Sequence, residues 1–318
     1  MLNQHIRSNH TATAGNVEVE SAAVEPSGLG CGCGYPEYVS PGIVERSDRI
    51  VSALRSAALD ADDSEELLAW LRGLPRAAVA EVGAQRRRVG IVHGDVDSLA
   101  GWQLGVEAME PADIALRAWL GCDGVGGGGG DGGRCGGGGG GDGAAEGAAN
   151  SKLLPTTPAA KIAAWCAEAD VSGLLCTHTC LPFGQMLKRQ QDDNQLAVFN
   201  NGSAGMPNFA STAYGLMTRV SDELTPPGDS LYGGVAGGLR YDAVPVAYDS
   251  EAFLRRFTAA WPEGSDAHVS YHERIVHGPS GFTPRNAARE GVELLPAAMQ
   301  LHREMSRRYA EKEEEGAA

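Results

Sequence analysis

The stretch LCTHTCLPFGQML, residues 175–187, places His178 between two threonines directly after an apolar run. An apolar run of this length predicts a buried strand, so His178 is expected where the strand ends. The stretch IVHGD, residues 91–95, repeats this arrangement at His93, and the stretch AGNVE places Asn16 in a Gly-Asn turn. Polar side chains at strand ends are typical of sites in layered α/β folds. The three stretches are therefore candidates for one functional site.

Apolar runs of strand length alternate with amphipathic segments along the chain, which predicts a mixed α/β fold. Two of the runs, 79–83 and 88–94, flank a basic tip and predict a β-hairpin. The other predicted strands are 172–178, 196–202, 213–221 and 243–249, and the predicted helices are 44–59, 64–75, 156–170, 250–260 and 285–310.

The composition of the 318 residues is that of a globular protein, with 42% hydrophobic and 21% charged residues. The formal net charge of −15 argues against a phosphate-backbone partner, so no nucleic acid is expected to bind. No apolar run has the length of a membrane span and no signal segment follows Met1, so no membrane partner is expected. Seven cysteines without a regular framework favour a reducing compartment. We expect an intracellular, cytoplasmic protein, with an organellar location left open.

Glycine dominates residues 121–151, which predicts a disordered insertion because glycine loses the most entropy on ordering. The insertion is not a phosphate-binding loop, since no Lys-Ser or Lys-Thr pair follows the glycines. Residues 1–13 are expected to form a disordered N-terminus, and residues 286–318 a C-terminal helix with a charged tail. One domain is therefore expected over residues 14–285.

The polar stretches resemble, in order, the last three of five motifs in the calcineurin-like metallophosphoesterases. GNVE (15–18) is similar to the Gly-Asn-His-Asp/Glu motif, VHGD (92–95) to the isolated His, and THTCLPF (177–183) to Gly-His-x-His. FNNGSAGMPNF (199–209) resembles the Asn-x-Gly-Ser turn of the bacterial and archaeal branch. The resemblance covers about residues 14 to 220, and four motifs in the family's order are more specific than any one alone.

The resemblance implies a calcineurin-like α/β sandwich, two β-sheets flanked by helices, with two divalent metal ions. Asn16, His93 and His178 match the family's ligands of one ion, and an amide oxygen with two imidazole nitrogens suits Mn, Fe or Zn. Cys180 would lie beside the second ion. Asp95 would hold His93 in one tautomer, or would be a solvated acid at the strand end.

The implied reaction is hydrolysis of a phosphomonoester or phosphodiester by a metal-bound hydroxide. The implied substrate is a phosphorylated small molecule or a phosphoprotein. Asn201 and Ser203, in the Asn-x-Gly-Ser turn, would lie on the phosphate side of the site.

Three departures from the family pattern bear on activity. Val17 replaces the histidine that the family uses as general acid. Cys180 replaces the second histidine of Gly-His-x-His, and a thiolate there would bind Zn or Fe. The Asp-x-His and Gly-Asp-x-x-Asp motifs have no counterpart before Gly15. The fold would therefore lack its first strands, and one of the two ions would lack most of its ligands.

Two explanations of the missing motifs stay open. If the chain as written lacks an N-terminal part of the native protein, the retained ligands favour a metal-dependent phosphoesterase. The alternative is a non-catalytic protein-interaction scaffold on the same fold, which the missing carboxylates and Val17 favour.

Two other clusters contain residue types that bind metal ions. Cys31 and Cys33 could join Cys176 and Cys180 in a thiolate zinc site, but their spacings are not those of zinc ribbons, and buried free cysteines are the commoner outcome. His268 and His272 share a helix face with His277 close by, and a solvated helix is the preferred interpretation there.

Overall fold

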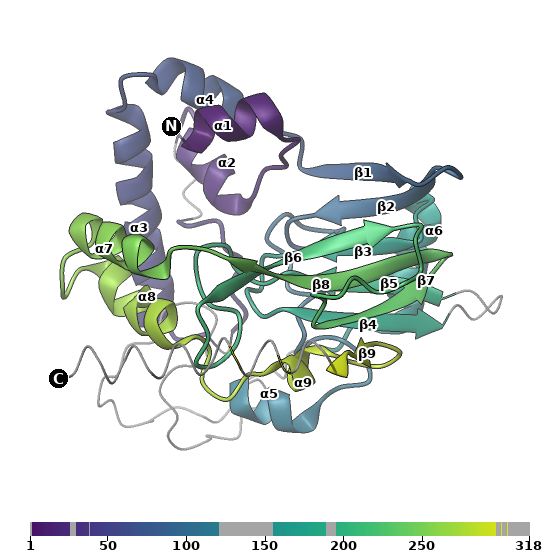
Figure 1. Ribbon diagram of the computed structural model, residues 1–318. Helices are drawn as coiled ribbons and strands as arrows, with labels where there is room; N and C mark the ends of the chain where they lie inside the picture. The colour runs from purple at the N-terminus through teal and green to yellow at the C-terminus, as the bar shows by residue number, and fades with distance from the viewer. Residues whose placement is uncertain are drawn as a thin grey trace.

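Two β-sheets lie face to face at the centre of the structure, with helices around them (Figure 1). The structure is a computed structural model that describes residues 2–25, 30–37, 39–120, 155–188 and 195–296, together with 300 and 304. The arrangement confirms the predicted mixed α/β class with two sheets flanked by helices.

The first sheet has the strand order β1-β2-β3-β5-β4. The central strands β2, β3 and β5 run parallel, whereas β1 and β4 pair antiparallel at the two edges. The carboxyl ends of the three central strands therefore lie at one edge of the sheet. The strands are β1 (Ala77–Val82), β2 (Arg87–Val92), β3 (Gly173–Cys176), β4 (Phe183–Lys188) and β5 (Gln195–Asn200).

The second sheet is antiparallel, with the order β6-β8-β7-β9. Its strands are β6 (Tyr214–Ser221), β7 (Tyr232–Ala236), β8 (Leu239–Ala247) and β9 (Glu293–Leu294). Aromatic side chains fill the space between the two sheets. The ring of Phe199 on β5 lies 6.2 Å from the ring of Tyr232 and 5.7 Å from that of Tyr241, measured between centroids. All three side chains are fully buried, so these rings join the sheets into one core.

Helices cover the sheets in two groups. Behind the first sheet in Figure 1 lies α6 (Ala159–Ala169), whose Ile162 and Trp165 belong to the same buried cluster as the strands. The second group lies beside the carboxyl edge of the first sheet, where α3 packs against α2, α4 and α8. The remaining helices are α1 (Leu2–Asn9), α2 (Asn16–Ala22), α3 (Pro41–Leu59), α4 (Ser64–Gly73), α5 (Ile114–Leu120), α7 (Ser250–Ala260), α8 (Asp266–His277) and α9 (Pro284–Ala287).

The hairpin and the strand expected around residue 175 are confirmed by β1, β2 and β3, and Arg86 at the hairpin tip has a φ of 49°. Two expectations are wrong. Residues 1–13 are not disordered throughout, since α1 forms there and Arg7 pairs with Glu66 at 3.7 Å and lies over the Trp70 ring.

No single helix runs through 285–310 either, because α9 ends at Ala287 and β9 follows at Glu293. The reason is local pairing with β4: Arg289 N donates to the carbonyl of Gly184, and Met186 N donates to the carbonyl of Glu290. The predicted glycine-rich insertion, 121–151, lies outside the described residues. In the described part of the chain, no helix combines the length and the apolar character that crossing a bilayer requires.

Candidate functional site

His93 and His178 follow two neighbouring parallel strands. Strand β2 ends one residue before His93, and β3 ends two residues before His178. The carbonyl of His93 accepts hydrogen bonds from the backbone N–H groups of Thr177 (3.1 Å) and His178 (3.0 Å), which hold the two strand ends together. The sheet thus places both imidazoles at its carboxyl edge, where the sequence predicted polar strand ends.

Asn16, the first residue of α2, completes a cluster with the two histidines, here called the ligand cluster. Its Oδ1 atom lies 2.9 Å from Nε2 of His93, and Nδ1 of His178 lies 3.0 Å from the same nitrogen. The three residues predicted from separate motifs therefore meet at one point. Asn16 is buried, and both histidines are mostly buried.

In the ligand cluster, Asn16 Oδ1, His93 Nε2 and His178 Nδ1 surround a single proton. His178 Nε2 donates to the carbonyl of Cys33 at 3.0 Å, so its Nδ1 carries a lone pair. Asn16 Oδ1 can only accept, so the proton on His93 Nε2 faces two acceptors at once. Ligand atoms around a tetrahedral zinc ion, with Zn–N of about 2.0–2.1 Å, lie roughly 3.3 Å apart. An ion in place of this proton would suit the donor set.

Burial sets the charge of both histidines. Desolvation lowers the pKa of His93 to about 4. Desolvation, followed by repulsion from His93, lowers the pKa of His178 to about 4. Both imidazoles are neutral at pH 7, which is the form that binds metal ions.

The turn before α2 is built against His93. A Cβ on Gly15 would lie 2.8 Å from Cε1 of His93 and 2.7 Å from a carboxylate oxygen of Glu18, so only glycine fits. Glu18 accepts the backbone N–H of Gly15 at 2.9 Å and caps the helix. Val17, the second residue of α2, offers no group that could transfer a proton.

Asp95 shapes the loop after β2. Its Oδ1 accepts the backbone N–H groups of Asp97 (2.9 Å) and Ser98 (2.8 Å), and its Oδ2 accepts that of Gln103 (3.1 Å). No hydrogen bond joins Asp95 to His93 in the described part of the chain. The structure therefore gives this buried carboxylate a loop-forming role in place of the tautomer-fixing or solvated roles expected from the sequence.

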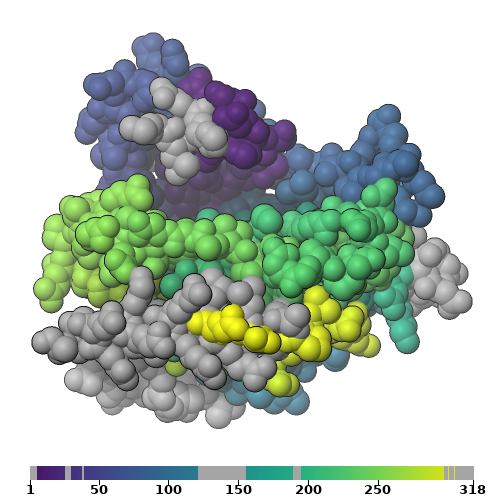
Figure 2. Space-filling view, in the orientation of Figure 1, coloured from purple at the N-terminus to yellow at the C-terminus, as the bar shows by residue number. Residues whose placement is uncertain are grey.

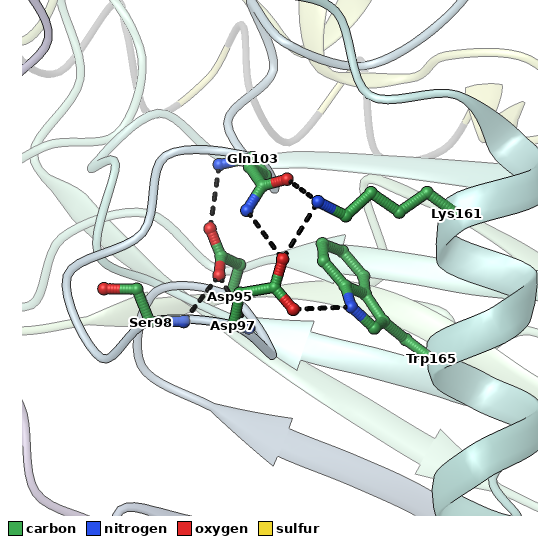
Figure 3. A network of polar contacts seen from close by, with 6 residues as sticks. All are labelled: Asp95, Asp97, Ser98, Gln103, Lys161 and Trp165. Atoms are coloured by element: carbon green, nitrogen blue, oxygen red, sulfur yellow. Dashed lines mark hydrogen bonds and ion pairs between the residues drawn. The ribbon is translucent and has the colours of Figure 1, made fainter.

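A surface network ties the same loop to α6, as Figure 3 shows. Lys161 pairs with Asp97 at 2.9 Å and bonds to the side chain of Gln103. Trp165 Nε1 donates to Asp97 at 2.9 Å. Hydrogen bonds from Lys161, then from Gln103 and Trp165, lower the pKa of Asp97.

Cys180 lies beside the ligand cluster with its thiol turned to the main chain. It has a φ of 63°, and its Sγ donates to the carbonyl of His178 at 3.3 Å. Ser203 Oγ donates to the carbonyl of Cys180 at 3.5 Å, and Asn201 N donates to that of Cys176 at 3.3 Å. Both residues predicted on the phosphate side therefore lie near the strand ends. Ser203 makes its contact there through its side chain, and Asn201 makes its contact through its backbone.

The described part of the chain holds no group of three or more His, Cys, Asp or Glu side chains that could bind a metal ion, and the ligand cluster combines two histidines with an asparagine. The four-cysteine site is not formed, because the Sγ atoms of Cys31 and Cys33 contact each other and Cys176 is buried in the core. Burial raises the pKa of the Cys176 thiol to about 12. The rings of His268 and His272 stack 4.4 Å apart on α8 without further ligands.

Arg274 on α8 is a candidate that the sequence interpretation missed. It is nine-tenths buried, its Nη2 donates to the carbonyl of Cys180 at 3.1 Å, and its Nε has no hydrogen-bond partner. No ion pair joins it to a carboxylate among the described residues. A buried cation without a counter-charge is costly, which makes Arg274 a candidate for holding an anionic group. Its spacing from the buried Ala267 and Ser270, seven and four residues, is the signal that could have found it.

Two solved structures are similar to this chain at low sequence identity. A hypothetical protein from Pyrococcus horikoshii OT3 is 14% identical, with a TM-score of 0.42 over 87% of this chain and 77% of the other. A metallophosphoesterase from Sphaerobacter thermophilus is 13% identical, with a TM-score of 0.40 over 87% of this chain and 81% of the other.

No protein-family model matches the chain, and no curated protein matches it either.

Proposed function

We propose that the protein is a metal-dependent phosphoesterase that binds one divalent ion at the ligand cluster. One observation carries the proposal: Nε2 of His93 lies 2.9 Å from Asn16 Oδ1 and 3.0 Å from His178 Nδ1. The three side chains come from separate parts of the chain. A neutral, partly buried set of two nitrogens and one amide oxygen suits Mn, Fe or Zn. Among the described residues, no three His, Cys, Asp or Glu side chains gather where they could hold a second ion.

The chain's own side chains supply the rest of the proposed site. A divalent ion there would polarise a water molecule and a phosphate oxygen. Arg274 would hold the substrate's negative charge through its guanidinium, whose planar fork matches a phosphate. Ser203, which contacts the same carbonyl as Arg274, would help to orient the phosphate. The proposed substrate is a phosphorylated small molecule or a phosphoprotein.

Metal content and activity test the proposal together. Purified protein is loaded with Mn²⁺ or Zn²⁺, and the bound ion is counted by mass spectrometry after removal of free ions. Hydrolysis of p-nitrophenyl phosphate and bis-p-nitrophenyl phosphate is measured on the same samples. We expect one bound ion and metal-dependent hydrolysis. His178→Ala should lose both, whereas His277→Ala, which removes a half-exposed histidine of α8, should keep both.

A scaffold without catalysis is the second candidate, favoured by Val17 and by the missing carboxylate ligands. One bound ion that depends on His178, without hydrolysis of either ester, would support the scaffold. Equal metal content in His178→Ala and in the unmodified chain would show that the ligand cluster is not the metal site.

A further inference from the structure

Arg274 carries a buried positive charge that its own helix does not neutralise. The two carboxylates of α8 have other partners: Asp266 pairs with Arg49 at 2.6 Å, and Glu273 lies beside two histidines of the same helix. Arg274 Nη2 donates to the Cys180 carbonyl, and its buried Nε has no hydrogen-bond partner. A carbonyl carries no formal charge, so the guanidinium still lacks a counter-ion within the described part of the chain.

The turn that follows β3 links this guanidinium to the ligand cluster. Arg274 Nη2 and Ser203 Oγ both donate to the carbonyl of Cys180, at 3.1 and 3.5 Å. Cys180 follows His178 by two residues, and its backbone N–H donates to the Thr177 carbonyl at 2.9 Å. One short turn therefore carries a proposed metal ligand and the carbonyl that holds Arg274.

The loop 203–211 holds Arg274 and Ser203 in fixed positions. Ser203 N donates to Asn208 Oδ1 at 2.9 Å, and Asn208 Nδ2 donates to the Ser203 carbonyl at 3.3 Å. Further along the loop, Ser211 N donates to the carbonyl of His277, the last residue of α8, at 2.8 Å. Donors that are already in place need no rearrangement when an anion binds or develops charge. The loop thus connects the two donors that meet at the Cys180 carbonyl.

The charge of a phosphate ester decides how well the ester compensates a buried cation. A phosphomonoester carries a charge of about −1.5 to −2 at pH 7 and has three free oxygens. A phosphodiester carries a single charge and has two free oxygens. A divalent ion and a guanidinium together are offset better by a dianion than by a monoanion when water is excluded. A second ester group would also place carbon where the guanidinium needs an oxygen.

We propose that Arg274 makes the site selective for phosphomonoesters over phosphodiesters. Its Nε and Nη2 bind two oxygens of the terminal phosphate side by side, which is the bidentate geometry that a guanidinium favours. This inference rests on the proposed function, because it assigns the ester class of that same site.

The proposed reaction consumes one water molecule. The water oxygen forms a bond to phosphorus, the bond between phosphorus and the ester oxygen breaks, and its electron pair stays on the ester oxygen. One proton of the water passes through solvent to that oxygen, so the products are an alcohol and hydrogen phosphate. Arg274 contacts the phosphate and exchanges no proton, since a guanidinium stays charged in proteins.

Two substrates with the same leaving group test the selectivity in the metal-loaded whole chain. The value of kcat/KM is measured for p-nitrophenyl phosphate, the monoester, and for bis-p-nitrophenyl phosphate, the diester. We expect the unmodified chain to prefer the monoester. Arg274→Gln, which keeps a donor but loses the charge, should lower kcat/KM for the monoester about 100-fold, the loss typical of one donor to a developing anion. The diester should lose less than about 10-fold.

Two further variants refine this comparison. Arg274→Lys keeps the charge without the planar fork and should retain part of the monoester preference. Arg255→Gln removes an exposed guanidinium on α7 and should leave both kcat/KM values unchanged.

Binding of inorganic phosphate gives a second readout that needs no turnover. Calorimetry of the metal-loaded chain compares phosphate, which is largely a dianion at pH 7.5, with dimethyl phosphate, a monoanion. Arg274→Gln should weaken phosphate binding about 10–100-fold, as expected for a hydrogen bond to a charged group, and should change dimethyl phosphate binding less. Urea unfolding of the same variant should show no loss of stability, because the substitution removes a buried cation without a counter-charge.

The outcomes separate the selectivity from the proposed function. Equal losses for the two esters in Arg274→Gln would overturn the selectivity, and a lower unfolding free energy alongside them would assign Arg274 a structural role. A preference of the unmodified chain for the diester would also overturn the selectivity, with the phosphoesterase itself retained. No metal-dependent hydrolysis of either ester would overturn the proposed function and this inference with it.

Discussion

Nε2 of His93 lies 3.0 Å from Nδ1 of His178, although 85 residues separate the two in the chain. Two neutral imidazoles hold this contact because β2 and β3 are parallel neighbours and end at the same edge. The contact also makes the pair sensitive to acid, since protonating both rings would place two charges within hydrogen-bond distance.

The metal-free protein should therefore lose stability as the pH falls. Burial holds the pKa of each histidine at about 4 in the folded state, against about 6.5 for a histidine exposed to water. Between these values the unfolded chain binds more protons, so unfolding becomes more favourable below pH 6.5. The expected loss between pH 7 and pH 5 is about 2 kcal/mol for each histidine. Urea unfolding in the presence of a chelator measures it.

A matched variant separates these histidines from other titrating groups. His178→Gln removes one titrating ring, and the difference in unfolding free energy between pH 7 and pH 5 should shrink accordingly. An unchanged difference in this variant would show that other groups cause the acid sensitivity.

Gly15→Ala should disturb the ligand cluster. The new Cβ would lie within 3.0 Å of the His93 ring and of the Glu18 carboxylate, so one of them must move. Overpacking of this kind typically costs about 1–3 kcal/mol. The expected result is a lower unfolding free energy and weaker Mn²⁺ binding, measured by denaturation and by metal titration.

Gly73→Ala provides the control for this variant. Gly73 is the last residue of α4, and a Cβ there meets nothing within 4 Å. Alanine should be neutral or stabilise the protein by about 0.5–1 kcal/mol without changing metal affinity. If both variants weaken Mn²⁺ binding equally, the close fit of Gly15 against His93 is not the cause.

Asp95→Ala should destabilise the loop after β2. The buried carboxylate accepts three backbone N–H groups, which would lose their partner. Hydrogen bonds to charged groups contribute about 1.5–3 kcal/mol, so a loss of at least 2 kcal/mol in unfolding free energy is expected. Asp97→Ala, in the exposed network of Figure 3, should cost less than about 1 kcal/mol. A larger loss for Asp97→Ala than for Asp95→Ala would contradict this assignment.

Phe199→Ala should weaken the contact between the two sheets. The ring lies against Tyr232 and Tyr241 and is fully buried, so its removal leaves a cavity in the core. Truncation of a buried phenylalanine costs about 3–5 kcal/mol. Leu224→Ala, at a half-exposed position, should change the unfolding free energy by no more than about 0.5 kcal/mol. Similar losses of unfolding free energy in both variants would show that the contact between the sheets does not stabilise the fold.

The sequence was sufficient to predict the strands that carry the site. Alternating apolar runs predicted β2 and β3, and the residue type at each strand end predicted where His93 and His178 would lie. Strand β4 was missed because it carries the polar Gln185, whose side chain bonds to the Glu110 carbonyl and to Arg289. Periodicity alone does not reveal a polar residue that finds its partners in distant segments.

The contacts that orient the side chains of the site could not be predicted from the sequence for the same reason. The orientation of the Asn16 amide depends on the Cys31 carbonyl, and the tautomer of His178 depends on the Cys33 carbonyl. Arg274 reaches the Cys180 carbonyl from a helix 94 residues further along the chain. Each contact joins segments whose relative position is set only by the complete fold, and none involves a spacing that repeats along the sequence.

Backbone pairing on either side of the glycine-rich stretch has a consequence for how this chain can change length. Thr157 N donates to the carbonyl of Ala108 at 2.7 Å, and Met109 forms a parallel bridge with Thr157. The chain between these anchors returns to its starting point whatever its length. A change in the number of residues between the anchors should therefore leave the two sheets in place, because the pairing itself sets where the chain re-enters them.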